Sequence, residues 1–271
     1  MMLWITDPHF NFLPQMGTYH FGRYMREENP TATMVLLTGD LAECRNFVEL
    51  TEEFSKGVGL PTYVVLGNHD AYGGGVLLMQ KRASEEFTSP VFYLPHMGPL
   101  LVAPDHYLIG VDGWYDARDG QVTPPGVLMS DWECIGEYKM LPQMKHFDGP
   151  KTVPGISQML ADREAKKAEL ILEQVLKAGA KKIWFATHVP PFAGATWHMG
   201  QNSNATWLPW MLNQVLGDLL LQFAMEHEGI EITVFCGHTH SPGEYKPTSN
   251  LTVRTGHSEY RHPRASGLIT P

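Results

Sequence analysis

Five short clusters of acidic, amide and imidazole residues are the part of this sequence that could do chemistry. Each follows an apolar run, which places it where a buried strand gives way to a loop. At residues 67–70, a Gly is followed by amide, imidazole and carboxylate ligands on backbone that can turn sharply. Such residues are also common in ordinary turns, so their recurrence is what matters. The clusters are Asp7-Pro8-His9, Gly39-Asp40, Gly67-Asn68-His69-Asp70, His188 and Gly237-His238-Thr239-His240.

The side chains in these clusters favour a hydrolytic metal site. Imidazole and carboxylate ligands with one amide oxygen and no thiolate suit Mn, Fe or Zn. In extended backbone, residues separated by one position project to the same side. We therefore expect each of two pairs, Asp7 with His9 and His238 with His240, to bind a metal ion together. A pair of metal ions needs a shared ligand, and the two carboxylate oxygens of Asp40 make it the natural bridge.

The first half of the chain predicts alternating strands and helices. Apolar runs favour strands at residues 2–6, 34–38 and 62–66, with helix candidates at residues 17–28, 41–56 and 76–87. This order implies parallel strands with helices on the faces of the sheet. Because the carboxyl ends of parallel strands meet at one edge, we expect Asp7, Asp40 and Asn68 to lie together there.

The second half predicts the strands that deliver the remaining histidines. Short runs between residues 91 and 111, separated by Pro and Gly, favour antiparallel hairpins. Apolar periodicity then predicts helices at about residues 156–178 and 208–228 and strands at residues 183–186 and 232–235. The two strands end just before His188 and Gly237, respectively.

Length and periodicity indicate one domain with insertions. A chain of 271 residues, 43% of them hydrophobic, can bury a sizeable core, and we expect a single domain over residues 1–271. The regular spacing of apolar residues fades at about residues 113–155 and 189–208. Connections this long with little regular structure are predicted to be insertions or lid loops that cover a site.

Charge and cysteine content limit the partners and the compartment. The formal net charge of -9 lacks the basic excess of a surface that tracks long nucleic acid. No stretch approaches the roughly 18 apolar residues that span a bilayer, and no basic signal-peptide region is present, so we expect no membrane association. Three cysteines without a CxxC pair favour a reducing compartment, and we expect a cytoplasmic protein. The sequence carries no signal for a particular oligomeric state.

Taken in order, the five clusters resemble those of the calcineurin-like metallophosphoesterases, and the resemblance covers residues 7–240. It implies an α/β fold, a four-layer αββα sandwich of two mixed β-sheets flanked by helices. It also implies two divalent metal ions at the strand ends. By motif position, Asp7, His9, Asp40 and His240 would hold one ion, and Asp40, Asn68, His188 and His238 would hold the other.

The resemblance further implies the reaction. The paired metal ions would lower the pKa of a bridging water, so that hydroxide attacks phosphorus in line. His69 would be the catalytic group that binds no metal and faces the leaving group, where a protonated imidazole could donate to the departing oxygen. Glu43 would either orient His69 or be a plain surface residue.

The Asn-His-Asp form of the third cluster is most similar to the class III cyclic-nucleotide and glycerophosphodiester phosphodiesterases. The protein phosphatase and purple acid phosphatase patterns differ at residues 41–45, at Asp70 and at His9. We therefore expect hydrolysis of a small phosphate ester, with a phosphodiester favoured. A phosphomonoesterase or a nuclease on the same centre is the alternative. A catalytically silent binding module is disfavoured because every expected ligand is present.

Six residues near the clusters are candidates for contact with substrate. Aromatic side chains stack on bases or sugars, but exposed Trp also occurs at protein interfaces, so residues 189–208 could form a lid or a partner surface. The candidates are Phe10, Tyr72, Trp197, His198, Asn202 and His257.

Overall fold

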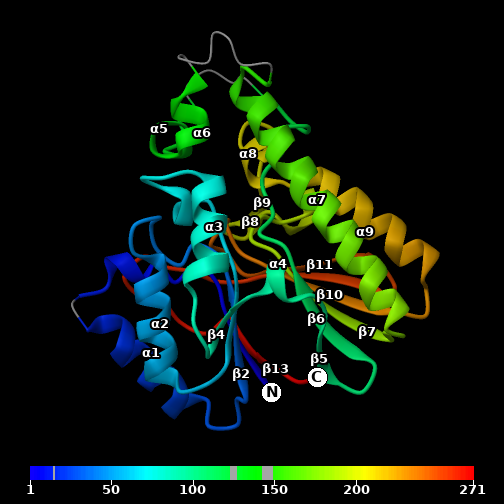
Figure 1. Ribbon diagram of the computed structural model, residues 1–271. Coiled ribbons are helices and arrows are strands. Elements are labelled where there is room, and N and C mark those ends of the chain that lie inside the picture. Colours follow the sequence, from blue (N-terminus) through cyan, green and yellow to red (C-terminus); the bar gives the residue numbers. More distant parts are fainter. Residues whose placement is uncertain (15, 123–126, 142–148) are drawn as a thin grey trace.

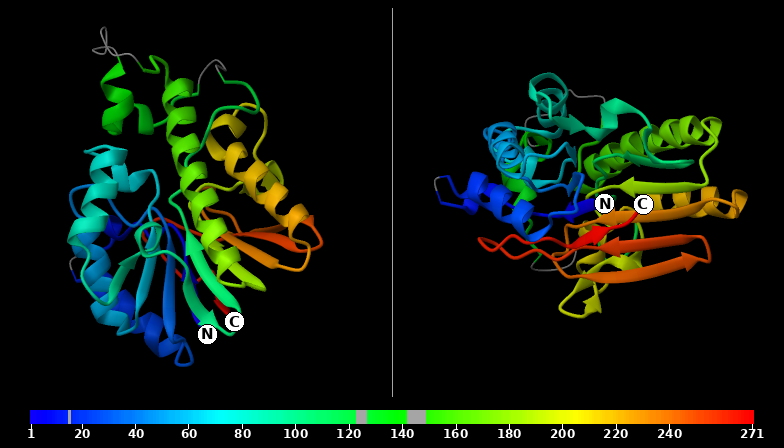
Figure 2. Two further views of the ribbon diagram at one scale, coloured as in Figure 1. Left: turned by 45° about the vertical axis from the view of Figure 1, so that its right-hand side comes forward. Right: turned by 90° about the horizontal axis from the view of Figure 1, so that it is seen from below.

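A computed structural model describes residues 1–14, 16–122, 127–141 and 149–271. Its strands form two large mixed sheets that face each other, and helices cover the outer face of each sheet (Figure 1, Figure 2). These layers confirm the predicted αββα sandwich.

The first sheet comes mainly from the first third of the chain. Its strands are β1 (Met2–Ile5), β2 (Met34–Thr38), β3 (Thr62–Val65), β4 (Val91–Tyr93) and β13 (Gly267–Ile269), in the order β13-β1-β2-β3-β4. Strands β1 to β4 run parallel, and β13 is antiparallel to β1. The covering helices are α1 (Gly17–Glu28), α2 (Phe47–Val58) and α3 (Val76–Glu86).

The second sheet comes from the rest of the chain. Its strands are β5 (Leu100–Ala103), β6 (His106–Gly110), β7 (Lys182–Ala186), β10 (Glu231–Cys236), β11 (Gly243–Thr248) and β12 (Leu251–Thr255), in the order β11-β12-β10-β7-β6-β5. The four central strands are parallel, and the two edge strands are antiparallel to their neighbours. Helices α7 (Val153–Lys177) and α9 (Gln214–Glu226) cover the outer face.

Short elements lie around the carboxyl ends of the strands. They are η1 (Phe10–Phe12), η2 (His69–Ala71), α4 (Leu94–Met97), α5 (Asp131–Cys134), α6 (Gly136–Lys139), η4 (Ala193–Ala195), β8 (Trp197–His198), β9 (Gln201–Asn202) and α8 (Leu208–Met211). The segments predicted as insertions supply several of these, and α5, α6 and α8 sit above the sheets in Figure 1. Of the first segment, residues 123–126 and 142–148 lie outside the described residues. Within the described part of the chain, no helix combines the length and apolarity needed to cross a bilayer.

The two sheets are held together by apolar packing and by buried carboxylates, one of which is Asp112. Trp4 packs edge-on against Phe235 across the interface, with ring centroids 5.0 Å apart. Just beyond β6, Asp112 Oδ1 accepts a hydrogen bond from Leu66 N after β3, at 2.9 Å. Asp112 Oδ2 accepts one from the Tyr93 hydroxyl at 2.5 Å. Asp112 therefore joins the two sheets at the end where the strands deliver the polar clusters.

Helix α2 begins at Phe47, so the predicted start at residue 41 is wrong. Phe10 N donates to the Leu41 carbonyl at 2.7 Å, and Ala42 N donates to Asp70 Oδ1 at 2.8 Å. These bonds hold Leu41 and Ala42 against the loops after β1 and β3, ahead of the first turn of the helix. The buried Leu41 and Ala42 extended the apolar pattern of the helix without belonging to it.

The helix predicted over residues 208–228 is instead two helices, α8 and α9. Asn213 interrupts it, because its backbone N donates to the Pro190 carbonyl at 2.9 Å and its side chain caps α9 by accepting from Leu216 N at 3.3 Å. Strand β4 is also corrected, since it pairs parallel with β3 in the first sheet, whereas β5 and β6 form the expected hairpin.

Candidate metal centre

Seven side chains from the ends of five strands converge on one point. They come from sequence positions up to 233 residues apart, and the parallel strand ends bring them together as predicted. Asp7 and His9 follow β1, Asp40 follows β2, Asn68 follows β3, His188 follows β7, and His238 and His240 follow β10.

One half of the cluster contains Asp7, His9, Asp40 and His240. One potential ligand atom from each lies within 4.8 Å of those of the other three. His9 Nε2 is 3.3 Å from His240 Nε2, and His240 Nε2 is 3.4 Å from Asp7 Oδ1. Donor atoms that crowd this closely around one point are arranged as they would be around a cation.

The other half is centred on the amide oxygen of Asn68. Asn68 Oδ1 lies 3.0 Å from both His188 Nε2 and His238 Nδ1. Asp40 lies between the two halves, with Oδ1 3.4 Å from His188 Nε2 and Oδ2 3.8 Å from His9 Nε2. Each carboxylate oxygen of Asp40 therefore faces a different half of the cluster.

Two imidazoles are held in a fixed orientation by backbone carbonyls. His188 Nδ1 is 2.9 Å from the Thr38 carbonyl, and His238 Nε2 is 2.8 Å from the Trp210 carbonyl. A carbonyl only accepts, so the proton lies on that outer nitrogen and the inner nitrogen presents a lone pair to the cluster.

The backbone at the cluster is left-handed at five of the seven residues, with φ between 44° and 67° at Asp7, His9, Asp40, His238 and His240. Non-glycine residues rarely adopt this region, and only five others do so in the described part of the chain. The predicted strand-like alternation within each pair is therefore wrong. Sharp left-handed turns, not extended backbone, aim both members of a pair inward.

Glycines at the cluster let the backbone pass directly against the polar side chains. Gly39 has φ of 87°, and a Cβ there would lie 2.4 Å from His188 Nδ1. At Gly237, a Cβ would lie 2.0 Å from both Asp7 Oδ2 and Thr6 Oγ1. These contacts explain why a glycine precedes the polar residues in the second and fifth clusters.

Burial dominates the electrostatics of the cluster. Burial and the charge of Asp7 raise the pKa of Asp40 well above its usual range. Burial also opposes ionisation of Asp7, but nearby His188 and His240 bring the pKa of Asp7 below its usual range. Burial lowers the pKa of His188 to about 3, so its ring is neutral at pH 7. Two buried carboxylates that oppose each other's ionisation are the situation that a bound cation relieves.

His69 lies beside the cluster without joining it. Its backbone N donates to Asp40 Oδ1 at 2.8 Å, its Nε2 is 3.9 Å from Asp40 Oδ2, and its ring stacks on Tyr72 with centroids 4.3 Å apart. Burial lowers the pKa of His69 to about 4, which leaves the imidazole neutral at pH 7. Glu43 pairs with Arg45 at 3.3 Å, which agrees with its interpretation as a surface residue.

The sequence model of the calcineurin-like phosphoesterases matches residues 2–242. The chain belongs to this family. It is therefore a hydrolase that acts on phosphoester bonds, as the five clusters predicted.

Two solved structures of other proteins share the fold. A dimetal phosphatase from Danio rerio has a TM-score of 0.58 at 13% identity, over 97% of this chain and 88% of that one. A phosphopantetheinyl hydrolase from Mycobacterium tuberculosis has a TM-score of 0.61 at 13% identity, over 96% of this chain and 89% of that one. No curated protein sequence matches the chain. At this level of identity, the similarity concerns the fold.

Asp131 is a buried residue of this phosphoesterase that no sequence pattern identified. Its Oδ1 accepts hydrogen bonds from Asn68 Nδ2 at 3.0 Å and from the Tyr72 hydroxyl at 2.5 Å. Because Nδ2 is engaged there, the amide oxygen of Asn68 turns toward His188 and His238. Asp131 begins α5 in the segment predicted as an insertion, where nothing in the surrounding sequence marks it.

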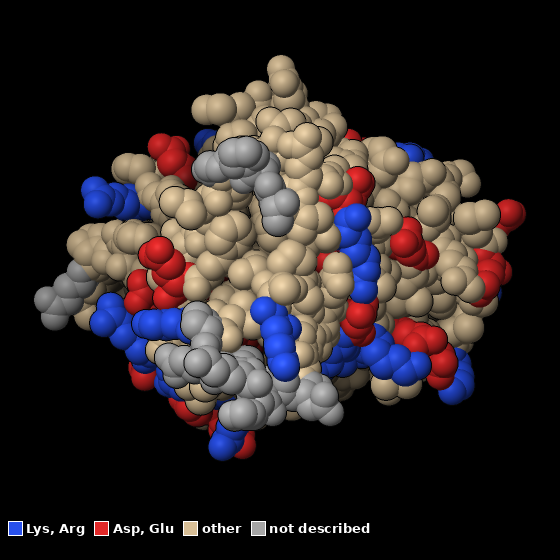
Figure 3. Space-filling model, turned by 90° about the horizontal axis from the view of Figure 1, so that it is seen from above, with Lys and Arg blue, Asp and Glu red and all other residues tan. Residues whose placement is uncertain are grey.

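A pocket of about 700 Å³ opens beside the seven-residue cluster, the candidate metal centre. Both predicted insertions contribute to its walls. Figure 3 shows the molecule from the upper side of Figure 1. On this face, Lys and Arg lie mostly in the lower half of the view and along its margin, and the upper middle is largely uncharged. Four residues of the seven-residue cluster line the pocket: Asp40, Asn68, His238 and His240. The other lining residues are His69, Tyr72, Leu128–Asp131, His198, Met199, Gln201–Asn204, Trp207, Met211, Thr239 and Tyr260.

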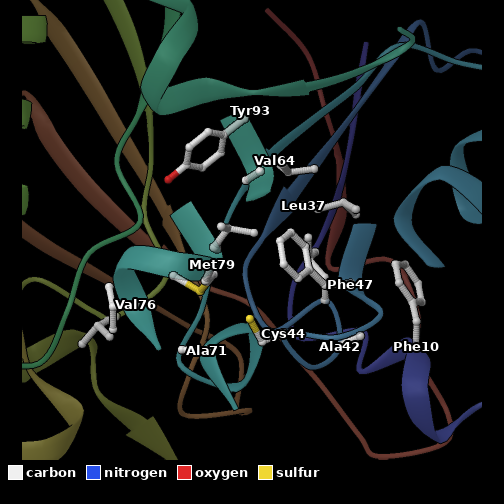
Figure 4. Close-up of a cluster of buried hydrophobic side chains, with 14 of the residues drawn as sticks. Phe10, Leu37, Ala42, Cys44, Phe47, Val64, Ala71, Val76, Met79 and Tyr93 are labelled. Atoms are coloured by element: carbon white, nitrogen blue, oxygen red, sulfur yellow. The ribbon is translucent and has the colours of Figure 1, made fainter. Parts of the chain in front are cut away.

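Three of the six predicted substrate contacts, Tyr72, His198 and Asn202, line this pocket, and the other three do not. Phe10 is buried in a cluster of apolar side chains (Figure 4). Its ring stacks on that of Phe54 in α2, with centroids 5.2 Å apart. The left-handed turn at His9 sends the chain back into the core, so closeness in sequence to a cluster residue did not place Phe10 in the site.

Trp197 and His257 are also absent from the described lining of the pocket. A Cβ on Gly243 would lie 2.3 Å from the Trp197 ring, so the indole packs against the start of β11. His257 lies after β12, and its carbonyl accepts from the Ser266 hydroxyl at 3.4 Å. Tyr260, three residues further on, lines the pocket instead and packs against His9 with ring centroids 4.4 Å apart.

Replacing Gly237 should strain the phosphoesterase because a Cβ at this position collides with Asp7 and Thr6. We expect Gly237→Ala to lower the free energy of unfolding by about 2 kcal/mol, measured by urea denaturation. The matched control is Gly229→Ala, where a Cβ meets no atom within 4 Å. The control should change the free energy of unfolding by less than about 0.5 kcal/mol. Equal effects of the two substitutions would contradict the close approach.

Proposed function

We propose that this phosphoesterase uses two divalent cations to hydrolyse a small phosphate ester, with a phosphodiester favoured. The observation that carries the proposal is the convergence of seven donor side chains from separate strand ends. Asp7, His9, Asp40 and His240 would hold one cation, and Asp40, Asn68, His188 and His238 would hold the other.

The donor set fits such cations. The carbonyls of Thr38 and Trp210 leave the inner nitrogens of His188 and His238 free to coordinate. Carboxylate, imidazole and amide donors without a thiolate favour Mn, Fe or Zn. The position of Asp40 between the two halves supports its assignment as the shared ligand.

When bound, two divalent cations supply an activated water and neutralise the phosphoryl oxygens. The chain's own contribution is to hold the ester in line, and His69 is placed to act on the leaving group. Neutral His69 donates an N–H hydrogen bond to the ester. The negative charge of a bound ester favours the imidazolium form of His69, which can then pass its proton to the departing oxygen.

The pocket supports a phosphodiester, because its volume of about 700 Å³ leaves room for a substituent beyond the reacting phosphate. A phosphomonoester is the alternative substrate. Assays of bis(p-nitrophenyl) phosphate and p-nitrophenyl phosphate with Mn, Fe or Zn test the proposal. Faster turnover of the diester supports it, and turnover of neither would contradict it.

Removing Asp40 should dismantle the pair of metal sites, because both halves of the cluster lose a ligand. We expect Asp40→Ala to bind about one metal ion per chain or fewer, and to lose at least about 10³-fold in kcat/KM. Metal content after dialysis against Mn measures the first effect. Asp218→Ala, at an exposed position of α9, is the control. Retention of two ions by Asp40→Ala would refute the shared ligand.

Removing His69 should slow turnover without removing metal. With phenyl or alkyl esters, whose leaving groups need a proton, we expect His69→Ala to lose about 10²-fold in kcat. With p-nitrophenyl esters the loss should be smaller, since that leaving group departs as an anion. Wild-type rates on the phenyl ester would exclude the role of His69 as proton donor.

Removing Asp131 should weaken one metal site selectively, because the amide of Asn68 loses the bond that turns its oxygen inward. We expect the affinity of the Asn68 site for Mn to fall about 10-fold to 100-fold in Asp131→Ala. The other site should be unchanged in calorimetric titration, and the spectroscopic signature of the coupled Mn pair should weaken. Tyr72→Phe is the control, because it removes the other contact of Asp131 but keeps its bond to Asn68. Wild-type titration of Asp131→Ala would contradict this role.

A further inference from the structure

We propose that the pocket beside the centre receives an uncharged organic group of the ester, one that combines an apolar surface with hydrogen-bonding atoms. This inference rests on the proposed function and names the class of its substrate: esters that carry their only negative charge on the reacting phosphate. Esters with a second anionic group, such as a further phosphate or a carboxylate, would be poor substrates.

The charges around the pocket support this class. Among the described residues that line it, none is Lys or Arg. Asp131 contributes an acid that is 1% exposed and already accepts two hydrogen bonds. A second anionic group on the ester would lose its hydration without gaining a cationic partner in this lining. An uncharged group avoids this cost.

One side of the pocket is an apolar wall, defined as Leu128, Met129, Trp207 and Met211. Leu128 is 84% exposed and Trp207 is 41% exposed. Large apolar side chains left accessible around a concave site are typical of ligand contacts. The wall comes from both predicted insertions, so the two segments together would contact the organic group.

The β8–β9 hairpin adds an apolar contact at a position where turn chemistry does not favour one. Its two turn residues, Met199 and Gly200, have φ of 49° and 79°. Such a turn favours Asn followed by Gly, so Met199 breaks the local preference while its side chain is 86% exposed beside the pocket. Met199 N donates to Ser241 Oγ at 3.1 Å, which ties the hairpin to the loop that carries His240. Departures of this kind are expected where a residue serves function.

Side-chain amides provide the polar part of the pocket. Gln201, Asn202 and Asn204 all line it. Asn202 Nδ2 donates to the Gly194 carbonyl at 3.0 Å, and Asn204 Oδ1 accepts from Trp207 N at 3.3 Å, so both side chains are anchored. Amides offer donors and acceptors without charge, which matches hydroxyl or amide groups on a neutral substrate.

A matched pair of substrates tests this assignment. The methyl phosphodiesters of 4-(carbamoylmethyl)phenol and 4-(carboxymethyl)phenol have nearly the same size and leaving group but differ by one charge far from phosphorus. With the metal-loaded enzyme, we expect kcat/KM to be at least about tenfold higher for the amide ester, mainly through KM.

A positive charge placed on the hairpin should reduce this preference. Met199→Lys should raise kcat/KM for the carboxylate ester about fivefold relative to the amide ester. The control is Met225→Lys, the same change at a 64% exposed position of α9 outside the described pocket lining, which should leave the ratio unchanged. Equal rates on the two esters, or equal effects of the two lysines, would overturn the assignment while leaving phosphodiester hydrolysis intact. No turnover of either ester would overturn the proposed function and this assignment with it.

Discussion

The arrangement of the centre depends on left-handed backbone at the ends of the strands. Five of the seven cluster residues adopt it, at a cost of about 1 kcal/mol or more each. Hydrogen bonds hold these turns, among them Asp7 N to the Gly39 carbonyl at 3.1 Å and His9 N to the Asp40 carbonyl at 3.0 Å. The two sheets therefore maintain a strained loop geometry, and that geometry aims the side chains at one point.

Packing between the two sheets offsets the free-energy cost of these strained loops. The strands that carry Asp7, His9, Asp40 and Asn68 belong to the first sheet, and those that carry His188, His238 and His240 belong to the second. A small rotation of one sheet against the other would separate the two groups. Apolar packing between the sheets and the buried carboxylate of Asp112 oppose that movement near the start of the loops.

Much of the fold and of the metal centre was predictable, because an apolar run and the polar residues that follow it are both visible in one short stretch of sequence. The parallel strands fixed where Asp40 and Asn68 would meet, whatever the loops between them did. The start of α2 was not predictable, since a distant carboxylate, Asp70, captures the backbone of Ala42. Asp131 was hidden for the same reason. Its partners lie 59 and 63 residues away, and only the folded chain brings them together.

The centre and the pocket divide the recognition of charge between them. Burial and the charge of Asp7 raise the pKa of Asp40. The two carboxylates are therefore difficult to ionise together unless a positive charge lies nearby. The proposed cations would provide that charge, and they would also be the partner of the anionic phosphate. The described lining of the pocket offers no lysine or arginine that could compete for the phosphate. An ester would therefore bind in one direction, with its charged end at Asp40 and its neutral end toward Trp207 and Met199.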